Sequence, residues 1–195
     1  MIVMTLNCRG LSSKPKKLAI CRLVVDQSVD VLFIQDTMGD GVRSAYSLES
    51  SLPGWSFCSV DAKGKSGGLL VGWNCKVLQF INSWAMDFGL YVALYSTELK
   101  MELGFLNIYG PYVEREGFWN HLLDFVSLNC SKIIVGGDLN FSIRLSKIWG
   151  DRDRSDCLSD LFSKIMDDHG LVDIEPSVVL PTWNNRRVGC ENICK

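Results

Sequence analysis

The run DVLFIQD, at residues 30–36, constrains the fold more than any other stretch of the sequence. Its centre, VLFI, is continuously apolar, and the carboxylates of Asp30 and Asp36 bound the run. A strand with one solvated face alternates apolar and polar residues, whereas a strand covered on both faces carries an unbroken apolar run. The sequence therefore predicts a central β-strand with packed layers on both of its faces.

Other hydrophobic patterns predict three helices and a block of strands. A first strand is expected at residues 2–6, and a helix after Pro15 with Ile20, Leu23 and Val24 on one side. Successive antiparallel strands are indicated by the segments WSFCSV, GGLLVGW, VLQFIN, LYVALYST and ELGFLNIYG. Two more helices are expected, at residues 114–128 and before Gly170. Their apolar stripes consist of Phe118, Leu122, Phe125 and Val126, and of Leu158, Leu161, Phe162, Ile165 and Met166.

This order of elements predicts an α/β fold with antiparallel sheets and no strict βαβ alternation. A two-layer sheet sandwich covered by helices, that is, a four-layer α/β/β/α sandwich, fits it best. The length of 195 residues and the hydrophobic fraction of 47% favour one domain with a large core over residues 1–195.

Charge and cysteine content exclude several classes of protein. The net charge of −2 indicates no global field for a nucleic acid or a membrane surface, and the local clusters KPKK, RDR and RR are each typical of a solvated patch. We expect neither a signal peptide nor a membrane-spanning segment, and hence an intracellular protein whose eight cysteines are thiols, mostly in the core. No pair of cysteines completes a zinc site.

Polar residues follow several strands at the point where each strand is expected to end. Asn7, Asp36 and Tyr109 occupy such positions, and Asp138 and Asn140 follow the three apolar residues and two glycines of IIVGG. Residues two apart in an extended chain share a face, so Asp138 and Asn140 should point the same way. Each residue has a structural alternative as a turn, cap or core residue. Polar groups gathered at the ends of several strands instead indicate a site.

The ordered motifs TLNCRGL, LFIQDT, SGGLLVGW, NIYGPY, IIVGGDLNF and PTWNNRR resemble the endonuclease/exonuclease/phosphatase superfamily, which includes abasic-site endonucleases and DNase I. They are most similar to the endonuclease domain of plant LINE-type (non-LTR) retrotransposons. The resemblance covers essentially the whole chain, and it implies a DNase I-like four-layer sandwich. It also implies DNA, bound through its phosphate backbone, as the partner, with no membrane and with a nuclear location.

The resemblance further implies a role for each matching residue. Asn7 corresponds to an asparagine near the scissile phosphate, and Asp36 to the glutamate that holds the divalent metal, Mg²⁺ or Mn²⁺. Tyr109 corresponds to a tyrosine of the phosphate pocket, and Arg115 to a DNA-contacting arginine. Asp138 corresponds to the aspartate that orients or activates the attacking water.

The remaining matches concern the substrate. Asn140 corresponds to the asparagine that donates to the phosphate, and Thr182 and Trp183 of PTWNNRR are expected to bind substrate. In such a site a Mg²⁺ ion acts as a Lewis acid, and amide, tyrosine and arginine donors share the phosphoryl charge.

Two departures from the family pattern predict weak or absent activity. Asp36 is one methylene shorter than the family's glutamate, and Mg²⁺ demands near-octahedral geometry at short distance. The family's C-terminal Ser-Asp-His has no counterpart, so we expect a C-terminally truncated domain that lacks its final strands. Neither His121 nor His169 suits the missing role, because both fall in expected helices.

Three functional hypotheses follow. The first is a retrotransposon-derived endonuclease-like domain that is weak or inactive, and the second is a working Mg²⁺-dependent nuclease. The third is a non-catalytic DNA-binding or interaction module. A superfamily phosphatase is a further alternative, and the oligomeric state is left open.

Overall fold

The apolar run within residues 30–36 forms β2 (Val31–Gln35), and all five residues of this strand are buried. In this computed structural model the described residues are 1–64, 66–129, 132–140 and 157–174. The chain divides into two compact units. The first contains Met1–Pro111 and Cys130–Leu139, and the second contains Tyr112–Asn129 and Asn140–Lys195.

The first sheet of the first unit has the strand order β1-β2-β4-β3. β1 runs parallel to β2, whereas β4 is antiparallel to both β2 and β3. The expected antiparallel character is therefore wrong for β1 and β2, because the crossover between them contains a helix. The bounds are β1 (Val3–Asn7), β3 (Trp55–Lys63) and β4 (Ser66–Asn74).

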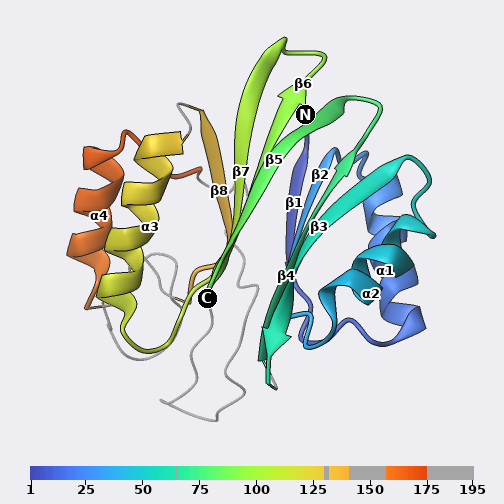
Figure 1. Ribbon diagram of the computed structural model, residues 1–195, viewed down its shortest axis with the longest axis horizontal. Helices are drawn as coiled ribbons and strands as arrows, with labels where there is room; N and C mark the ends of the chain where they lie inside the picture. The colour runs from blue at the N-terminus through green and yellow to red at the C-terminus, as the bar shows by residue number, and fades with distance from the viewer. Residues whose placement is uncertain (65, 130–131, 141–156, 175–195) are drawn as a thin grey trace. The chain divides into compact units, whose positions relative to one another are not determined.

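The second sheet has the order β5-β6-β7-β8, and it is also mixed, because β7 and β8 are parallel. Its bounds are β5 (Leu78–Met86), β6 (Gly89–Ser96), β7 (Met101–Tyr109) and β8 (Ile133–Asp138). Figure 1 shows the two sheets of this unit packed face to face, with α1 and α2 outside the first sheet.

Alternation along β2 explains why it is buried on both faces. Leu32 and Ile34 point to one side and pack with the helices, while Val31 and Phe33 point to the other and pack with the second sheet. Gln35 has the parity of Val31 and Phe33, so its side chain faces the layer between the sheets. Its burial there requires hydrogen-bonding partners.

Two helices cover the first sheet. α1 (Lys14–Asp26) has Pro15 in its first turn and buries Ile20 and Val24 as expected, but Leu23 is 43% exposed and the expectation for it is wrong. α2 (Gly41–Glu49) begins at the N-cap Asp40, whose Oδ1 accepts a hydrogen bond from the Arg43 amide. The hydrophobic pattern did not predict this second helix.

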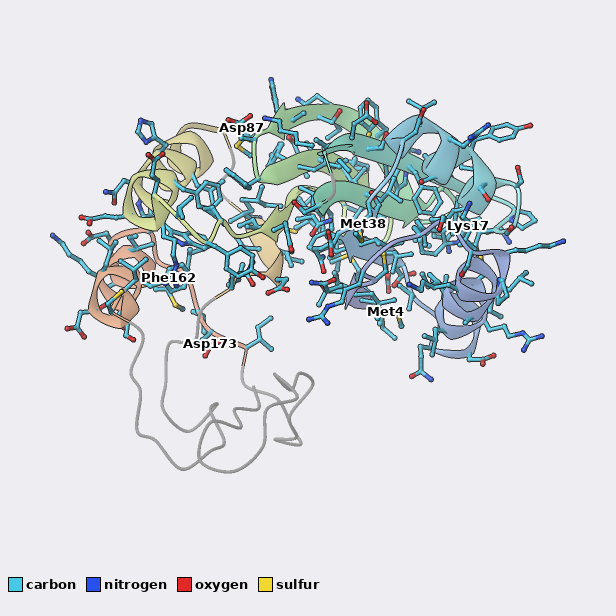
Figure 2. All side chains as sticks on the ribbon, turned by 90° about the horizontal axis from the view of Figure 1, so that it is seen from below. Met4, Lys17, Met38, Asp87, Phe162 and Asp173 are labelled. Atoms are coloured by element: carbon cyan, nitrogen blue, oxygen red, sulfur yellow. The ribbon has the colours of Figure 1, made fainter. Side chains whose placement is uncertain are left out.

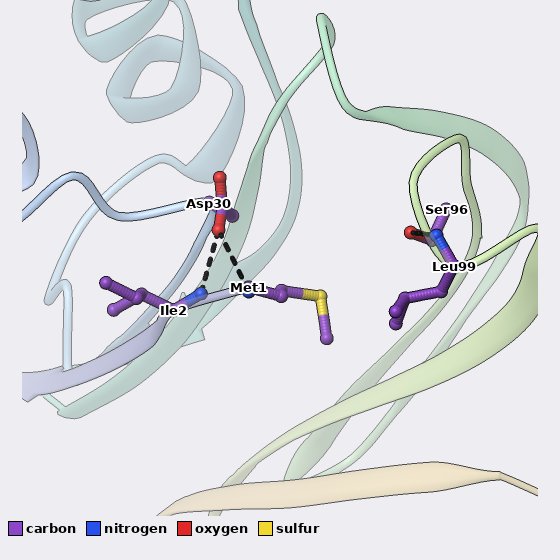
Figure 3. Close-up of polar contacts among 5 residues, drawn as sticks. All are labelled: Met1, Ile2, Asp30, Ser96 and Leu99. Carbon is purple, nitrogen blue, oxygen red and sulfur yellow. Dashed lines mark hydrogen bonds and ion pairs between the residues drawn. The ribbon is translucent and has the colours of Figure 1, made fainter.

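Asp30 holds the start of β1, at the end of the first sheet far from Asn7. Its Oδ2 accepts a 2.8 Å hydrogen bond from the amide of Ile2 and lies 3.9 Å from the amino nitrogen of Met1 (Figure 3). In the turn after β6, the Oγ of Ser96 accepts a 3.1 Å bond from the Leu99 amide. These bonds satisfy backbone donors near strand ends.

The described helices of the second unit are α3 (Arg115–Asn129) and α4 (Ser159–Asp168), close to the expected bounds. They pack on each other, with the rings of Trp119 and Phe162 5.0 Å apart and nearly perpendicular. Figure 2 labels Phe162 on α4. α4 buries Phe162 and Ile165, and Gly170 follows it at a φ of 62°, which confirms the expected stop. Among the described helices, none combines the length and apolar character needed to cross a membrane.

Candidate functional site

A single hydrogen bond joins the last residues of two strands that lie in different sheets. Asn7 ends β1 and Asp138 ends β8, and Nδ2 of Asn7 donates to Oδ2 of Asp138 over 2.6 Å. The other end of the amide is also held, since Oδ1 of Asn7 accepts a 3.3 Å bond from the Arg9 amide. Both contacts fix the orientation of the Asn7 amide. The second N–H of the Asn7 side chain can donate to another group.

Parallel pairing brings further expected site residues to the same strand ends. Asn7 pairs with Gln35, the residue before Asp36, and Tyr109 pairs with Asp138. The carboxyl ends of parallel neighbours lie at one edge of a sheet, which is how residues far apart in sequence come together. Tyr109 is half-buried at the end of β7.

Asp36 is buried, with 8% of its surface exposed, and its backbone has a φ of 56°. Its Oδ1 accepts a 2.8 Å hydrogen bond from the amide of Gly67, in the stretch SGG that begins β4. The carbonyl of Asp36 accepts from the Gly10 amide at 2.7 Å. A left-handed conformation costs a non-glycine residue free energy, so these contacts must hold it in place.

The turn after Asn7 is fixed by a lysine that sequence analysis did not single out. Nζ of Lys16 donates to the carbonyl oxygens of Cys8, Arg9 and Gly10 over 2.7, 3.2 and 2.7 Å. An ammonium group has three N–H donors, and this arrangement uses all three. Arg9, held at a φ of 45°, is exposed directly beside Asn7.

Cys8 lies under this turn, and its Sγ is 3.5 Å from the carbonyl oxygen of Asp36. Burial raises the pKa of the Cys8 thiol from 9.0 to about 11, while the positive charge of Lys16 opposes the rise. The thiol is therefore neutral at ordinary pH. Of the described cysteines Cys21 is buried, whereas Cys75 and Cys157 are exposed, so the expectation of core positions is wrong for these two.

Glycines allow the strands that carry the site to approach each other. Gly137 precedes Asp138 with a φ of 133°, and a Cβ added there would collide with the backbone of Ile108. A Cβ on Gly110 would collide with the backbone of Leu139. Glycine is therefore required both before Asp138 and directly after Tyr109, where the backbones of the two site strands approach each other.

The expected residues of the second unit form a separate pair. Nη2 of Arg115, at the start of α3, donates to the carbonyl oxygen of Asn140 over 3.4 Å, and Asn140 has a φ of 54°. The structure thus brings Arg115 to the backbone of Asn140. Thr182 and Trp183 lie outside the described residues.

Both histidines of the sequence belong to the second unit. His121 is exposed on α3 as expected, with Nδ1 2.7 Å from the carbonyl oxygen of Gly117. His169 is the C-cap of α4.

The chemistry available in the first unit is that of an anion site with acidic acceptors. The Asn7 amide can donate to an oxyanion, and Asp138 can accept a proton or a hydrogen bond from water. Asp36 supplies a second carboxylate at the same edge. Within the described part of the chain, no three His, Cys, Asp or Glu side chains cluster as a metal site.

Gln35 and Asn107, which were not predicted as functional residues, are 1% and 0% exposed between the sheets. Each is a polar residue inside an otherwise apolar strand, in FIQD and FLNI. That pattern could have revealed them, because a polar side chain at a buried strand position needs a hydrogen-bonding partner.

Comparisons with known proteins agree with this architecture. Residues 4–189 match the model of the Endonuclease/Exonuclease/phosphatase family. No curated protein matches the sequence. The two mixed sheets with flanking helices confirm the expected α/β, DNase I-like fold class.

Three solved structures illustrate the likeness. The 3′ phosphatase NExo from Neisseria, bound to a product DNA hairpin, has a TM-score of 0.72 and 14% identity over 98% of this chain and 85% of that one. The endonuclease domain of TRAS1, a telomere-specific non-LTR retrotransposon, has a TM-score of 0.69 and 15% identity over 98% and 82%. A mannosyl-6-phosphatase of Bacteroides thetaiotaomicron, Bt3783, has a TM-score of 0.56 and 13% identity over 71% and 65%, so the chain spans less than two thirds of that protein. Similarity at these identities describes the fold, whereas the family match extends over most of the sequence: the chain belongs to the endonuclease/exonuclease/phosphatase family.

Proposed function

We propose that this chain is a divalent-metal-dependent phosphodiesterase domain that acts on DNA, similar to a LINE-type retrotransposon endonuclease, with a low rate of turnover. The observation that carries the proposal is the 2.6 Å hydrogen bond between Asn7 and Asp138. It joins an amide donor to a carboxylate acceptor at the edge where β1 and β8 end. Hydrolysis of a phosphodiester needs both kinds of group within reach of one phosphate.

Both Asn7 and Asp138 can still interact with a substrate while they are bonded to each other. The amide of Asn7 has a second N–H that can donate to a phosphate oxygen. The carboxylate of Asp138 can orient a water molecule and accept its proton, since the bond to Asn7 holds the carboxylate in one direction. In this proposal Tyr109 adds a hydroxyl donor from the strand beside Asp138.

Mg²⁺ or Mn²⁺ fits the donors of this edge. Asp36 presents one oxygen to Gly67 and keeps the other for an ion. Mg²⁺ commonly binds one or two carboxylates, keeps several waters and takes further oxygens from a substrate phosphate, so it requires no larger protein cage. A bound ion would polarise the phosphate and stabilise charge on the leaving oxygen.

The low turnover follows from two features of the chain's own residues. Asp36 reaches less far than a glutamate would, which weakens ion binding at a buried position. The residues of the first unit, Met1–Pro111 and Cys130–Leu139, include no histidine. A group of residues that acts together loses most of its rate when one member is missing.

Plasmid nicking by purified, folded protein tests this proposal. We expect slow nicking with Mg²⁺ or Mn²⁺, none with EDTA and none from Asp138→Ala. Asp26→Ala, which removes a carboxylate at the end of α1, is the matched control and should nick like the wild type. Nicking that survives Asp138→Ala would contradict the proposed role of this residue.

A non-catalytic DNA-binding module is the second candidate, and the exposed Arg9 favours it. The two ion pairs found among the described residues, Met1 with Asp30 and Lys63 with Asp87, do not involve Arg9. Its guanidinium is therefore available to a phosphate beside Asn7. Salt-sensitive DNA binding that weakens in Arg9→Ala, without nicking by the wild type, would favour this candidate. Equal DNA binding at low and high salt would count against both candidates. The roles expected of Arg115, Asn140, Thr182 and Trp183 stay predictions.

A further inference from the structure

Two buried amides, Gln35 and Asn107, form a polar bridge between the sheets of the first unit. Gln35 ends β2 in the first sheet, and Asn107 lies in β7 of the second. Nε2 of Gln35 donates to Oδ1 of Asn107 over 2.6 Å. We call this pair the inter-sheet clasp.

All four side-chain N–H groups of the clasp donate hydrogen bonds. The second N–H of Gln35 donates to Oγ1 of Thr5 in β1 at 3.0 Å. Nδ2 of Asn107 donates to the carbonyl oxygens of Ile34 in β2 and Leu70 in β4, at 3.0 and 2.9 Å. One side chain of the second sheet is thus bonded to two strands of the first, so the relative position of the strands is fixed in direction as well as in distance.

Most of the layer between the sheets cannot supply this restraint. It is built from apolar side chains such as Val31, Phe33, Val92 and Phe105. The hydrophobic effect is non-directional, so apolar contacts oppose separation of the sheets more than they oppose sliding. Burying two amides is unfavourable unless every group is bonded, and a fully satisfied polar network specifies one arrangement of a core.

The residues of the clasp lie on strands that pair with the strands of Asn7 and Asp138. Gln35 pairs with Asn7, and Asn107 pairs with Gly136, two residues before Asp138. A slide of one sheet past the other by one residue is about 3.3 Å. Even a fraction of that displacement would break the 2.6 Å bond between Asn7 and Asp138.

We propose that Gln35 and Asn107 are positioning residues that hold the two sheets in the register at which Asn7 meets Asp138. They act through the strands and do not touch the substrate. Their importance for catalysis rests on the proposed function. Their effect on the Asn7–Asp138 contact is independent of that function. The two can therefore be tested separately.

The test is the NMR signal of the Asn7 side-chain amide, assigned by its disappearance in Asn7→Ser. Asp138→Ala defines the position of this signal without the hydrogen bond. In Gln35→Leu and in Asn107→Leu we expect the signal to move most of the way toward that position, with circular dichroism confirming a folded protein. Leu94→Ala is the matched control, because Leu94 is 0% exposed in the same layer but is not bonded to the clasp.

Each outcome decides the matter. A signal that stays at its wild-type position in folded Gln35→Leu overturns the proposal, and so does an equal shift in Leu94→Ala. Should Asn107→Leu fail to fold, Gln35→Leu decides alone, because it leaves the bonds of Asn107 to Ile34 and Leu70 intact. If the signal moves as expected but the wild type neither nicks nor binds DNA, the proposed function fails and the positioning of Asn7 by the clasp stands.

Discussion

The side chains of Asn7 and Asp138 are in hydrogen-bonding contact across 131 positions of sequence. The contact joins the edge strand β1 of one sheet to the edge strand β8 of the other. It depends on parallel pairing in both sheets and on the register between them, so it reports on the arrangement of the whole first unit. This dependence makes Asn7 a sensitive position for testing the site.

Asn7→Ala should lower any measured DNA cleavage on the order of 100-fold, because it removes a donor to the phosphate. Asn7→Asp should weaken DNA binding further than Asn7→Ala does, since it adds a negative charge beside Asp138. The measurements are nicking rates and DNA affinity at fixed salt. Asn74→Ala is the control, because Asn74 ends β4 of the same sheet at the end of the strands far from Asn7. Asn7→Ala with wild-type cleavage and affinity would remove Asn7 from the site.

Asp36→Glu should lower the Mg²⁺ concentration that supports half-maximal nicking. The longer side chain would keep its bond to Gly67 within reach while extending an oxygen toward the ion, and Mg²⁺ is sensitive to small differences in ligand distance. A Mg²⁺ titration of both proteins measures the effect, with Asp26→Glu as control. An unchanged or higher half-saturating concentration would show that the short side chain of Asp36 is not what limits ion binding.

Much of the architecture could be predicted from local patterns, and the exceptions have physical causes. The apolar run of β2 and the stripe of α4 were visible because burial of large side chains leaves a strong periodic signal. α2 gave no such signal, because its buried residues are mostly small: Gly41, Ser44, Ala45 and Leu48. Short helices with small buried residues rely on a cap and on their surroundings.

The roles of the candidate site residues were accessible from sequence only through the ordered motifs. Local patterns place Asn7 and Asp138 at strand ends, but their contact depends on how two sheets slide past each other. Lys16 was hidden for a different reason. Its role depends on the left-handed turn at Arg9, which brings three carbonyl groups toward one ammonium, and no local pattern marks that turn.

Lys16→Met should reduce the free energy of unfolding by about 1–3 kcal/mol, because three carbonyl groups lose a charged donor. The turn that carries Arg9 should loosen with it, so DNA binding should fall as well. Lys16→Arg should restore only part of the loss, since a planar guanidinium cannot reproduce the three directions of an ammonium. Urea unfolding measures the effect, with the exposed Lys14→Met as control. Equal stability of the two methionine variants would contradict the proposed restraint.

Cys8 should react with iodoacetamide only at high pH, because burial raises its pKa to about 11 from 9.0. The folded state binds this proton more tightly than the unfolded state does. The resulting contribution to stability is complete below pH 9 and is lost as the pH rises toward 11. Peptide mass spectrometry after alkylation measures the reactivity, with the exposed Cys75 as internal comparison. The stability of Cys8→Ser should fall less steeply than that of the wild type over the same pH range, and parallel curves would contradict the shift.

Gly137→Ala should destabilise the first unit by roughly 2 kcal/mol or more, because the position combines an unfavourable φ with close backbone packing. The φ of 133° excludes an ordinary side chain, and the added Cβ would meet the carbonyl oxygen and amide nitrogen of Ile108 in the neighbouring strand. Gly39→Ala is the matched control. A Cβ there lies 3.9 Å from the nearest atom, the carbonyl oxygen of Thr37, and should change stability by no more than about 0.5 kcal/mol. Urea unfolding of both variants decides the matter, and the Asn7 amide signal of Gly137→Ala should shift toward its position in Asp138→Ala, because any retreat of β8 from β7 displaces the carboxylate that Asn7 contacts.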